Sequence, residues 1–237
     1  MTENIRVAII DDQQRIIDAV TAFLGDTPDI SVVASTTAAG ELFPLLAQVP
    51  IDVLILDLHM PGASWQELLA RLRQDNPDLP VVALTSAPAA TLLSPVLAAG
   101  AMGYVEKGYA TEELALALRV VSNGDRYTPS HAFVVSQVDE GRLLDVNHRF
   151  TEVFGHSRQH LLGRRVEDLG LWDDLTVRRE LITAAVTYGK VQSRAAFRTN
   201  RAVVWQSDVT IRTLRHSAYP PPVVVGEVDR SPAPSLG

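Results

Sequence analysis

The sequence predicts two domains of different fold class: an α/β domain built on a doubly wound, five-stranded parallel sheet, and a C-terminal α+β domain built on an antiparallel sheet. Three observations favour this division. Apolar runs of strand length alternate with helical stretches up to about residue 125. Apolar residues that alternate with period two, as in strands of an antiparallel sheet, are found in residues 190–213. Charge divides in the same way, because residues 1–130 carry 7 basic and 16 acidic side chains, net −9, whereas residues 131–237 carry 14 and 12, net +2.

Composition excludes several classes of site. The chain has no cysteine, which excludes disulfides, thiolate zinc sites, thiol nucleophiles and cysteinyl adducts. The first apolar run, Val7–Ile10, is too short for a signal peptide or a membrane span, so we expect a cytoplasmic protein with no membrane contact. The acidic first half argues against nucleic acid binding there, and the net charge of the second half is too small to argue for it.

Five apolar runs rich in Val, Ile and Leu are typical of parallel strands that are covered on both faces. They are Ile5–Ile10, Ser31–Ser35, Asp52–Asp57, Pro80–Thr85 and Ala101–Glu106. Helical stretches follow each of them, at residues 15–26, 39–50, 64–77, 89–100 and 111–124. Gly25, Gly100 and Gly124 lie where three of these helices should end, and Thr111 is a suitable start for the last one.

Polar side chains follow the predicted strands at their carboxyl ends, where doubly wound sheets carry their functional sites. Asp11 and Asp12 follow the first strand, Asp57 ends the third, Thr85 ends the fourth and Lys107 follows the fifth. Three converging carboxylates would repel one another unless a cation lies among them, and Mg²⁺ suits such hard oxygen ligands. The lysine and the hydroxyl would then hold phosphoryl oxygens, so the pattern predicts phosphoryl transfer to a carboxylate.

The segments "AIIDDQQ", "LILDLHMPG", "ALTSA" and "GYVEKGYATEELALALRVVSNGDRYTPS" closely resemble the flavodoxin-like, CheY-like receiver domain of two-component response regulators, over about residues 4–130. These segments are most similar in sequence to the subfamily whose output domain is usually a helix-turn-helix of the quorum-regulator kind. The resemblance implies that Asp57 accepts a phosphoryl group from a histidine kinase. It also implies that Asp12 binds Mg²⁺ directly, Asp11 through water, and the backbone carbonyl of His59 as a further ligand.

The same resemblance implies roles for three other residues. Lys107 would contact the phosphoryl group, and Thr85 and Tyr104 would form a switch pair that reports phosphorylation to the face around the last helix. Gly108 departs from the proline or aspartate that many receivers have there, which leaves the amplitude of switching open but not the chemistry.

The second half begins with two strand-like runs around Asp139-Glu140-Gly141, a hairpin signal. Short helical segments follow, and then a longer helix over about Asp173–Tyr188, which we expect to carry Arg178 and Arg179 on its polar, solvated side. If this helix began a helix-turn-helix, further helices should follow Gly189. Instead residues 190–213 alternate with period two, and "PPVVVGEVD" forms a last strand-like run, so we expect no DNA reading by this half.

This order of elements resembles the PAS sensory domain over about residues 132–230, especially in "LLDVNHRFTEVFGHSRQHLLGRRVEDL" and the hairpin with Trp205. PAS domains bind small molecules or cofactors between helices and sheet, or dimerise and relay a signal. The lack of cysteine excludes flavin-adduct photochemistry, and residues 161–215 contain no histidine for haem. We interpret His148, His156 and His160 as surface residues. A pocket for an apolar ligand stays open, but an empty core is the favoured interpretation and the ligand is unknown.

The predicted organisation is a receiver over residues 1–126, a linker over 127–131, a PAS domain over 132–230 and a tail over 231–237. We expect a homodimer that is phosphorylated by a sensor histidine kinase and signals through the PAS domain to an unknown protein partner. It is not expected to act as an enzyme beyond slow self-dephosphorylation. Two alternatives stay open, a DNA-binding transcription regulator and a PAS small-molecule sensor in which the receiver is secondary. Whether the chain is a fragment of a longer signalling protein is also left open.

Overall fold

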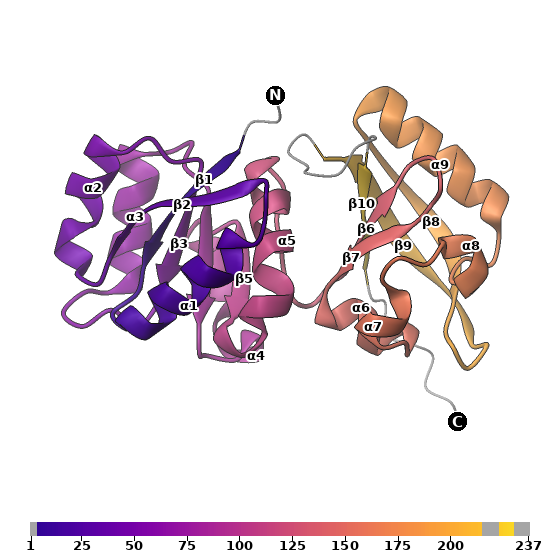
Figure 1. The fold of residues 1–237 in the computed structure, drawn as a ribbon, viewed down its shortest axis with the longest axis horizontal. Coiled ribbons are helices and arrows are strands. Elements are labelled where there is room, and N and C mark those ends of the chain that lie inside the picture. The colour runs from indigo at the N-terminus through magenta and orange to yellow at the C-terminus, as the bar shows by residue number, and fades with distance from the viewer. Residues whose placement is uncertain (1–3, 215–222, 230–237) are drawn as a thin grey trace. The chain divides into compact units, whose positions relative to one another are not determined.

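The chain folds into two units, each built around its own five-stranded sheet (Figure 1). The computed structural model describes residues 4–214 and 223–229. Contacts divide the chain between Thr128 and Pro129. The predicted tail, residues 231–237, lies outside the described residues.

The first unit contains an all-parallel sheet with the strand order β2-β1-β3-β4-β5. This order is one of the two common doubly wound orders, so the predicted fold class is confirmed. Its strands are β1 (Ile5–Ile10), β2 (Ile30–Thr36), β3 (Val53–Asp57), β4 (Val81–Thr85) and β5 (Gly103–Glu106). Its helices are α1 (Gln14–Gly25), α2 (Leu42–Gln48), α3 (Trp65–Asp75), α4 (Ala89–Ala98) and α5 (Ala110–Ser122), with short 3-10 turns η1 (Ala39–Glu41) and η2 (Lys107–Tyr109).

Helices cover both faces of this sheet. Helices α1 and α5 contact each other, whereas apolar residues of α2, α3 and α4 pack in one cluster with the strands. Every residue of β3 and β4 is buried, as expected for central parallel strands. The polar residues at the ends of these strands are therefore fixed to a rigid framework.

The second unit contains an antiparallel sheet with the strand order β7-β6-β10-β9-β8, which confirms the predicted α+β layout. Its strands are β6 (Ala132–Gln137), β7 (Leu143–Val146), β8 (Lys190–Arg198), β9 (Val204–Thr213) and β10 (Val223–Val228). Its helices are α6 (His148–Phe154), α7 (Arg158–Leu161), α8 (Val166–Leu169) and α9 (Leu175–Tyr188). Strands β8 and β9 pair along their length directly after α9, where a helix-turn-helix would need a recognition helix.

The core of the second unit lies between these helices and one face of the sheet. Phe154 stacks on Phe150 with ring centroids 4.2 Å apart and meets Phe197 edge-on at 6.0 Å. The buried side chain of Asn147 caps α6, because its Oδ1 accepts hydrogen bonds from the backbone N–H groups of Phe150 and Phe133. Aromatic packing and a satisfied cap thus hold the short helices against the sheet.

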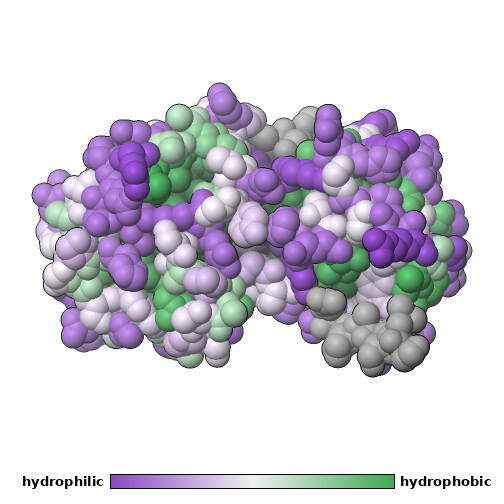
Figure 2. Space-filling model, turned by 90° about the horizontal axis from the view of Figure 1, so that it is seen from below, coloured by the Kyte–Doolittle hydropathy of each residue, from purple (hydrophilic) through white to green (hydrophobic). Residues whose placement is uncertain are grey.

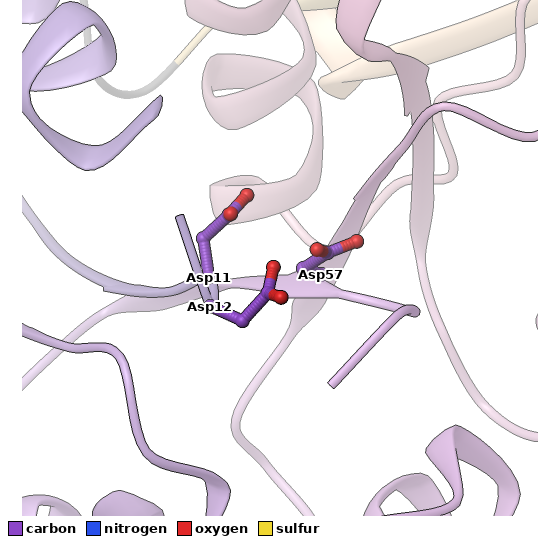
Figure 3. Close-up of side chains that lie close together, drawn as sticks. All are labelled: Asp11, Asp12 and Asp57. Carbon is purple, nitrogen blue, oxygen red and sulfur yellow. The ribbon is translucent and has the colours of Figure 1, made fainter. Parts of the chain in front are cut away.

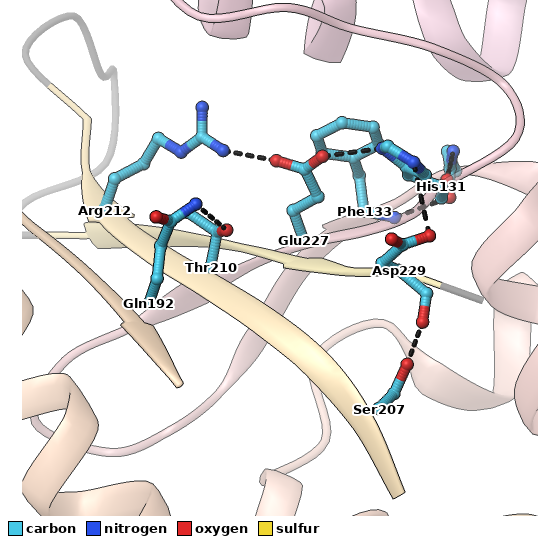
Figure 4. Close-up of polar contacts among 9 residues, drawn as sticks. His131, Phe133, Gln192, Ser207, Thr210, Arg212, Glu227 and Asp229 are labelled. Atoms are coloured by element: carbon cyan, nitrogen blue, oxygen red, sulfur yellow. Dashed lines mark hydrogen bonds and ion pairs between the residues drawn. The ribbon is translucent and has the colours of Figure 1, made fainter. Parts of the chain in front are cut away.

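A polar chain links three strands of this sheet (Figure 4). His131 precedes β6 and lies 2.6 Å from Glu227 of β10, measured from Nδ1 to Oε1. Arg212 of β9 donates a hydrogen bond to the other carboxylate oxygen of Glu227. The hydrogen bond with Glu227 raises the pKa of His131 above its ordinary value, although burial opposes the shift.

The long helix α9 differs from its prediction at one position. Arg178 was expected on the solvated side of the helix but is only 5% exposed, whereas Arg179 is exposed as predicted. Arg178 lies three, four and seven residues before Leu181, Ile182 and Ala185, which are all buried. This spacing places Arg178 on the inward face of the helix, so the interpretation as a solvated residue was wrong.

The exposed surface is mixed in character. On the face shown in Figure 2, hydrophilic residues predominate and hydrophobic residues form separate patches between them. None of the helices in the described ranges is long and apolar enough to cross a membrane.

Candidate metal and phosphoacceptor site

Three carboxylates meet at the carboxyl end of the parallel sheet (Figure 3). Asp11 and Asp12 directly follow β1, and Asp57 is the last residue of β3, the strand beside it. One oxygen from each carboxylate lies within 4.8 Å of the others. Adjacent parallel strands that end at the same level thus bring together residues that are far apart in the sequence.

Lys107 joins this cluster from the fifth strand. It begins η2 directly after β5, and its Nζ lies 2.7 Å from Asp11 Oδ2 and 2.9 Å from Asp57 Oδ2. The side chains of both aspartates are 1% exposed and that of Lys107 is 11% exposed. At such burial a single ammonium bridging two carboxylates offsets part of their repulsion.

Backbone groups fix the direction of the two buried carboxylates. The N–H of Gln13 donates to Asp11 Oδ1 at 3.0 Å, and the N–H of His59 donates to Asp57 Oδ1 at 3.1 Å. The side chain of His59 is exposed. Each carboxylate is therefore held by the loop that follows its own strand.

The residues present suit a divalent cation. Asp12 Oδ1 is buried and has no hydrogen-bond partner among the described residues, so one carboxylate oxygen beside the cluster still needs a positive charge. Three carboxylates against one lysine also leave excess negative charge. Oxygen donors of this kind suit Mg²⁺.

Burial affects protonation in the cluster. It raises the pKa of Asp11 above its ordinary value, and the hydrogen bonds from Lys107 and Gln13 offset part of that increase. Burial alone would lower the pKa of Lys107, but its hydrogen bonds to Asp11 and Asp57 outweigh burial and raise it. Lys107 is therefore charged at neutral pH.

Thr85 and Tyr104 meet in the loop after β4. Thr85 is fully buried at the end of β4, and its hydroxyl accepts a hydrogen bond from Ala87 N at 3.2 Å. The hydroxyl of Tyr104 donates to Ala87 O at 2.6 Å, and burial raises the pKa of Tyr104 to about 12. Both side chains thus bond Ala87, and no hydrogen bond joins either of them to the carboxylates within the described ranges.

The structure therefore brings Asp11, Asp12, Asp57 and Lys107 into one cluster and places Thr85 and Tyr104 beside it around Ala87. The sequence-based prediction missed the backbone groups of Gln13 and Ala87, because main-chain donors and acceptors carry no residue-type signal.

Comparison with protein families finds a match in each unit. Residues 7–119 match the response regulator receiver domain, and residues 128–186 match a PAS domain. Response regulator GacA of Pseudomonas viridiflava is 32% identical over 123 residues, which is 52% of this chain and 58% of that protein. Response regulator UvrY of Escherichia coli K12 is 29% identical over 126 residues, 53% of this chain and 58% of that protein. The chain thus spans less than two thirds of the length of these relatives.

Solved structures match the same part of the chain. The isolated receiver domain of RcsB from Salmonella enterica serovar Typhimurium, determined with phosphomimetic BeF3-, is 28% identical, with a TM-score of 0.50 over 54% of this chain and 94% of that one. A LuxR-family response regulator from Aurantimonas sp. SI85-9A1 is 25% identical, with a TM-score of 0.50 over 53% of this chain and 90% of that one. The chain therefore carries the receiver domain of a two-component response regulator, followed by a PAS domain.

Proposed function

We propose that this protein is a cytoplasmic phosphorelay response regulator in which Asp57 accepts a phosphoryl group from a sensor histidine kinase, with Mg²⁺ bound at the cluster. The observation that carries the proposal is the position of Asp57, which is 1% exposed, 2.9 Å from Lys107 and within 4.8 Å of two further carboxylates. This arrangement offers a nucleophile, a cation for the transferred oxygens and a metal site at one point.

The reaction is an in-line displacement. A carboxylate oxygen of Asp57 attacks the phosphorus of the phosphohistidine, the P–N bond breaks and the leaving imidazole takes up a proton. Lys107 neutralises charge on the transferred phosphoryl oxygens. Asp12, Asp57 and the backbone carbonyl of His59 would hold Mg²⁺ directly and Asp11 through water, and bound Mg²⁺ supplies further charge neutralisation.

The switch that we propose uses Thr85 and Tyr104. A phosphoryl group on Asp57 presents new acceptor oxygens. The Thr85 hydroxyl accepts from Ala87 N, so its own O–H can donate to these oxygens if Thr85 moves toward them. The loop that also accepts the hydrogen bond of Tyr104 would then shift, and the tyrosine with it. Phosphorylation would thereby change the face of the receiver around α5.

The output that we propose is self-association or contact with another protein through the PAS domain. The chain has no external substrate in this account, and slow hydrolysis of the aspartyl phosphate is its only self-reaction. The antiparallel hairpin after α9 supports this output over DNA reading.

DNA binding is the second candidate, because similar proteins include RcsB in a complex with DNA, at 28% identity and a TM-score of 0.51. That similarity covers 54% of this chain and 64% of that one. A gel-shift assay with mixed-sequence duplex DNA at low salt discriminates the two, and we expect no shift at micromolar protein. A salt-sensitive shift would favour the regulator that binds DNA.

The phosphoacceptor is tested with acetyl phosphate, a small phosphodonor that needs no kinase. The 237-residue protein with Mg²⁺ should gain one phosphoryl group by intact-protein mass spectrometry, and the gain should be lost in hydroxylamine because an acyl phosphate is labile. Asp57→Asn or removal of the metal with EDTA should abolish it.

The matched control is Asp75→Asn, which changes an exposed aspartate of α3 and should leave phosphorylation unchanged. Phosphorylation that persists in Asp57→Asn, or that proceeds equally without metal, contradicts the proposal.

A further inference from the structure

Arg178 is a buried cation that has no anionic partner among the described residues. It is 5% exposed on α9, and its Nη2 is buried with no hydrogen-bond partner. Within residues 4–214 and 223–229, no ion pair or hydrogen bond engages its guanidinium. Burial correspondingly lowers the pKa of Arg178, and the charge of Glu167 opposes the shift only in part. A buried unpaired charge is costly, so the Arg178 guanidinium calls for an anionic partner that the described residues do not supply.

The nearby acidic side chains are engaged elsewhere. Glu167 accepts a hydrogen bond from Arg165 at 2.8 Å and is 38% exposed, so it belongs to the surface. Glu140 forms an ion pair with Arg142 at 2.9 Å. The helix cap Asp174 accepts from Thr176 N at 2.7 Å. None of them neutralises Arg178 directly.

The guanidinium lies beneath the turn between β6 and β7. A Cβ atom built on Gly141 would lie 3.1 Å from Arg178 Nη2, and Gly141 has a φ of +62°, which a side chain rarely adopts. Glycine at this position therefore leaves room for the guanidinium inside the unit.

Arg178 also lines a cavity of about 40 Å³ between the helices and the sheet of the second unit. The hydroxyl-bearing Ser136 is the other polar side chain of the lining, and the remainder is apolar, including Phe150, Ile182 and Phe197. This volume exceeds what one water molecule needs, which is roughly 15 Å³. An apolar cavity with one or two converging polar groups is the usual form of a small-ligand site.

We propose that this cavity binds a small monocarboxylate with a short apolar chain, whose carboxylate pairs with Arg178. One guanidinium matches one carboxylate through two parallel N–H···O bonds. The chain of the ligand packs against Phe150 and Ile182, and the size of the cavity favours a chain of a few carbon atoms. The site is independent of the phosphoryl chemistry at Asp57.

The test is isothermal titration calorimetry of the dialysed 237-residue protein with acetate, propionate and butyrate, and with propionamide and butyramide as neutral analogues. We expect saturable one-to-one binding of at least one carboxylate, with its amide at least about 10-fold weaker. Arg178→Met should weaken the carboxylate at least about 30-fold, since truncating one member of a buried charge pair costs that much or more. Arg178→Lys keeps the positive charge but cannot form two parallel hydrogen bonds to the carboxylate. Its affinity should fall between those of the unchanged protein and Arg178→Met.

Arg179→Met is the matched control, because Arg179 is the exposed neighbour on the same helix and its loss should change the affinity less than about 2-fold. The proposal is overturned if no carboxylate binds saturably, if Arg178→Met binds as tightly as the unchanged protein, or if the amide binds as tightly as its carboxylate. The comparison of carboxylate with amide still decides the question if Arg178→Met does not fold.

Discussion

Arg119 of the first unit and Arg178 of the second are buried to a similar extent, but their surroundings differ. In the receiver, Arg119 of α5 is 3% exposed and forms a two-point ion pair with Asp29, with Nε–Oδ2 and Nη2–Oδ1 distances of 2.8 and 2.9 Å. In the PAS domain, Arg178 is buried to a similar extent but has no ion-pair partner within the described residues. The first arginine contributes to folding within its own unit, whereas the second carries a charge that no other described residue neutralises.

This contrast teaches that burial alone does not define the role of a charge. A paired buried charge is costly to break, because removing one partner leaves the other uncompensated. An unpaired buried charge is costly to keep. The same substitution, arginine to methionine, should therefore have opposite effects on stability at these two positions.

Arg119→Met should have the largest effect. It leaves Asp29 buried without its guanidinium, and we expect the receiver to lose about 3–5 kcal/mol of unfolding free energy in urea. The double variant Asp29→Leu/Arg119→Met should recover part of this loss, because it removes both charges. Arg126→Met, at an exposed position, should change the free energy by less than about 0.5 kcal/mol. An equally small effect of Arg119→Met would contradict the conclusion that the Arg119–Asp29 pair stabilises the receiver.

Lys107→Met should have the next largest effect on stability. Without the ammonium, Asp11 and Asp57 face each other at 1% exposure, and we expect a loss of about 2–3 kcal/mol without Mg²⁺. Burial already raises the pKa of Asp11, and loss of Lys107 raises it further. A carboxyl whose pKa is higher in the folded than in the unfolded state lowers stability at pH values above its unfolded pKa. The stability that Lys107→Met loses should therefore shrink as the pH falls. Unfolding measured at several pH values checks this, and a loss that grows on acidification would contradict it.

Arg178→Met should instead leave the ligand-free PAS domain as stable or raise its unfolding free energy by about 1 kcal/mol, because it removes an uncompensated charge. The measurement is the urea midpoint of dialysed protein, with Arg179→Met beside it. A loss above about 2 kcal/mol would show that the chain itself stabilises the Arg178 charge.

The smallest effect concerns His131. Its pKa is raised by the hydrogen bond with Glu227, so its stabilising contribution is complete below the unfolded value of about 6.5 and is lost as the pH rises through the folded value. The urea midpoint of the PAS transition should therefore fall as the pH rises above the unfolded pKa of about 6.5. His131→Gln should flatten this slope, and an unchanged slope would exclude His131 as its source.

The receiver site could be predicted from the sequence because its framework is regular. Once the apolar runs are assigned as parallel strands, Asp11, Asp57 and Lys107 must lie at one edge of the sheet. The pair Asp29–Arg119 could not be predicted, since its members are 90 residues apart and no local pattern links them. Arg178 could have been found, because its spacing to Leu181, Ile182 and Ala185 follows the buried face of α9. The prediction that Arg178 is solvated relied on its charge and not on its spacing along the helix.

If phosphorylation of Asp57 controls assembly of the chain, the light-scattering mass on a sizing column should depend on it. The mass is measured with Mg²⁺ alone and with Mg²⁺ plus beryllofluoride, a mimic of the phosphoryl group, for the unchanged protein and for Asp57→Asn. We predict that the mass doubles only with the mimic and only when Asp57 is present. An unchanged mass while the mimic demonstrably binds would contradict control of assembly by phosphorylation.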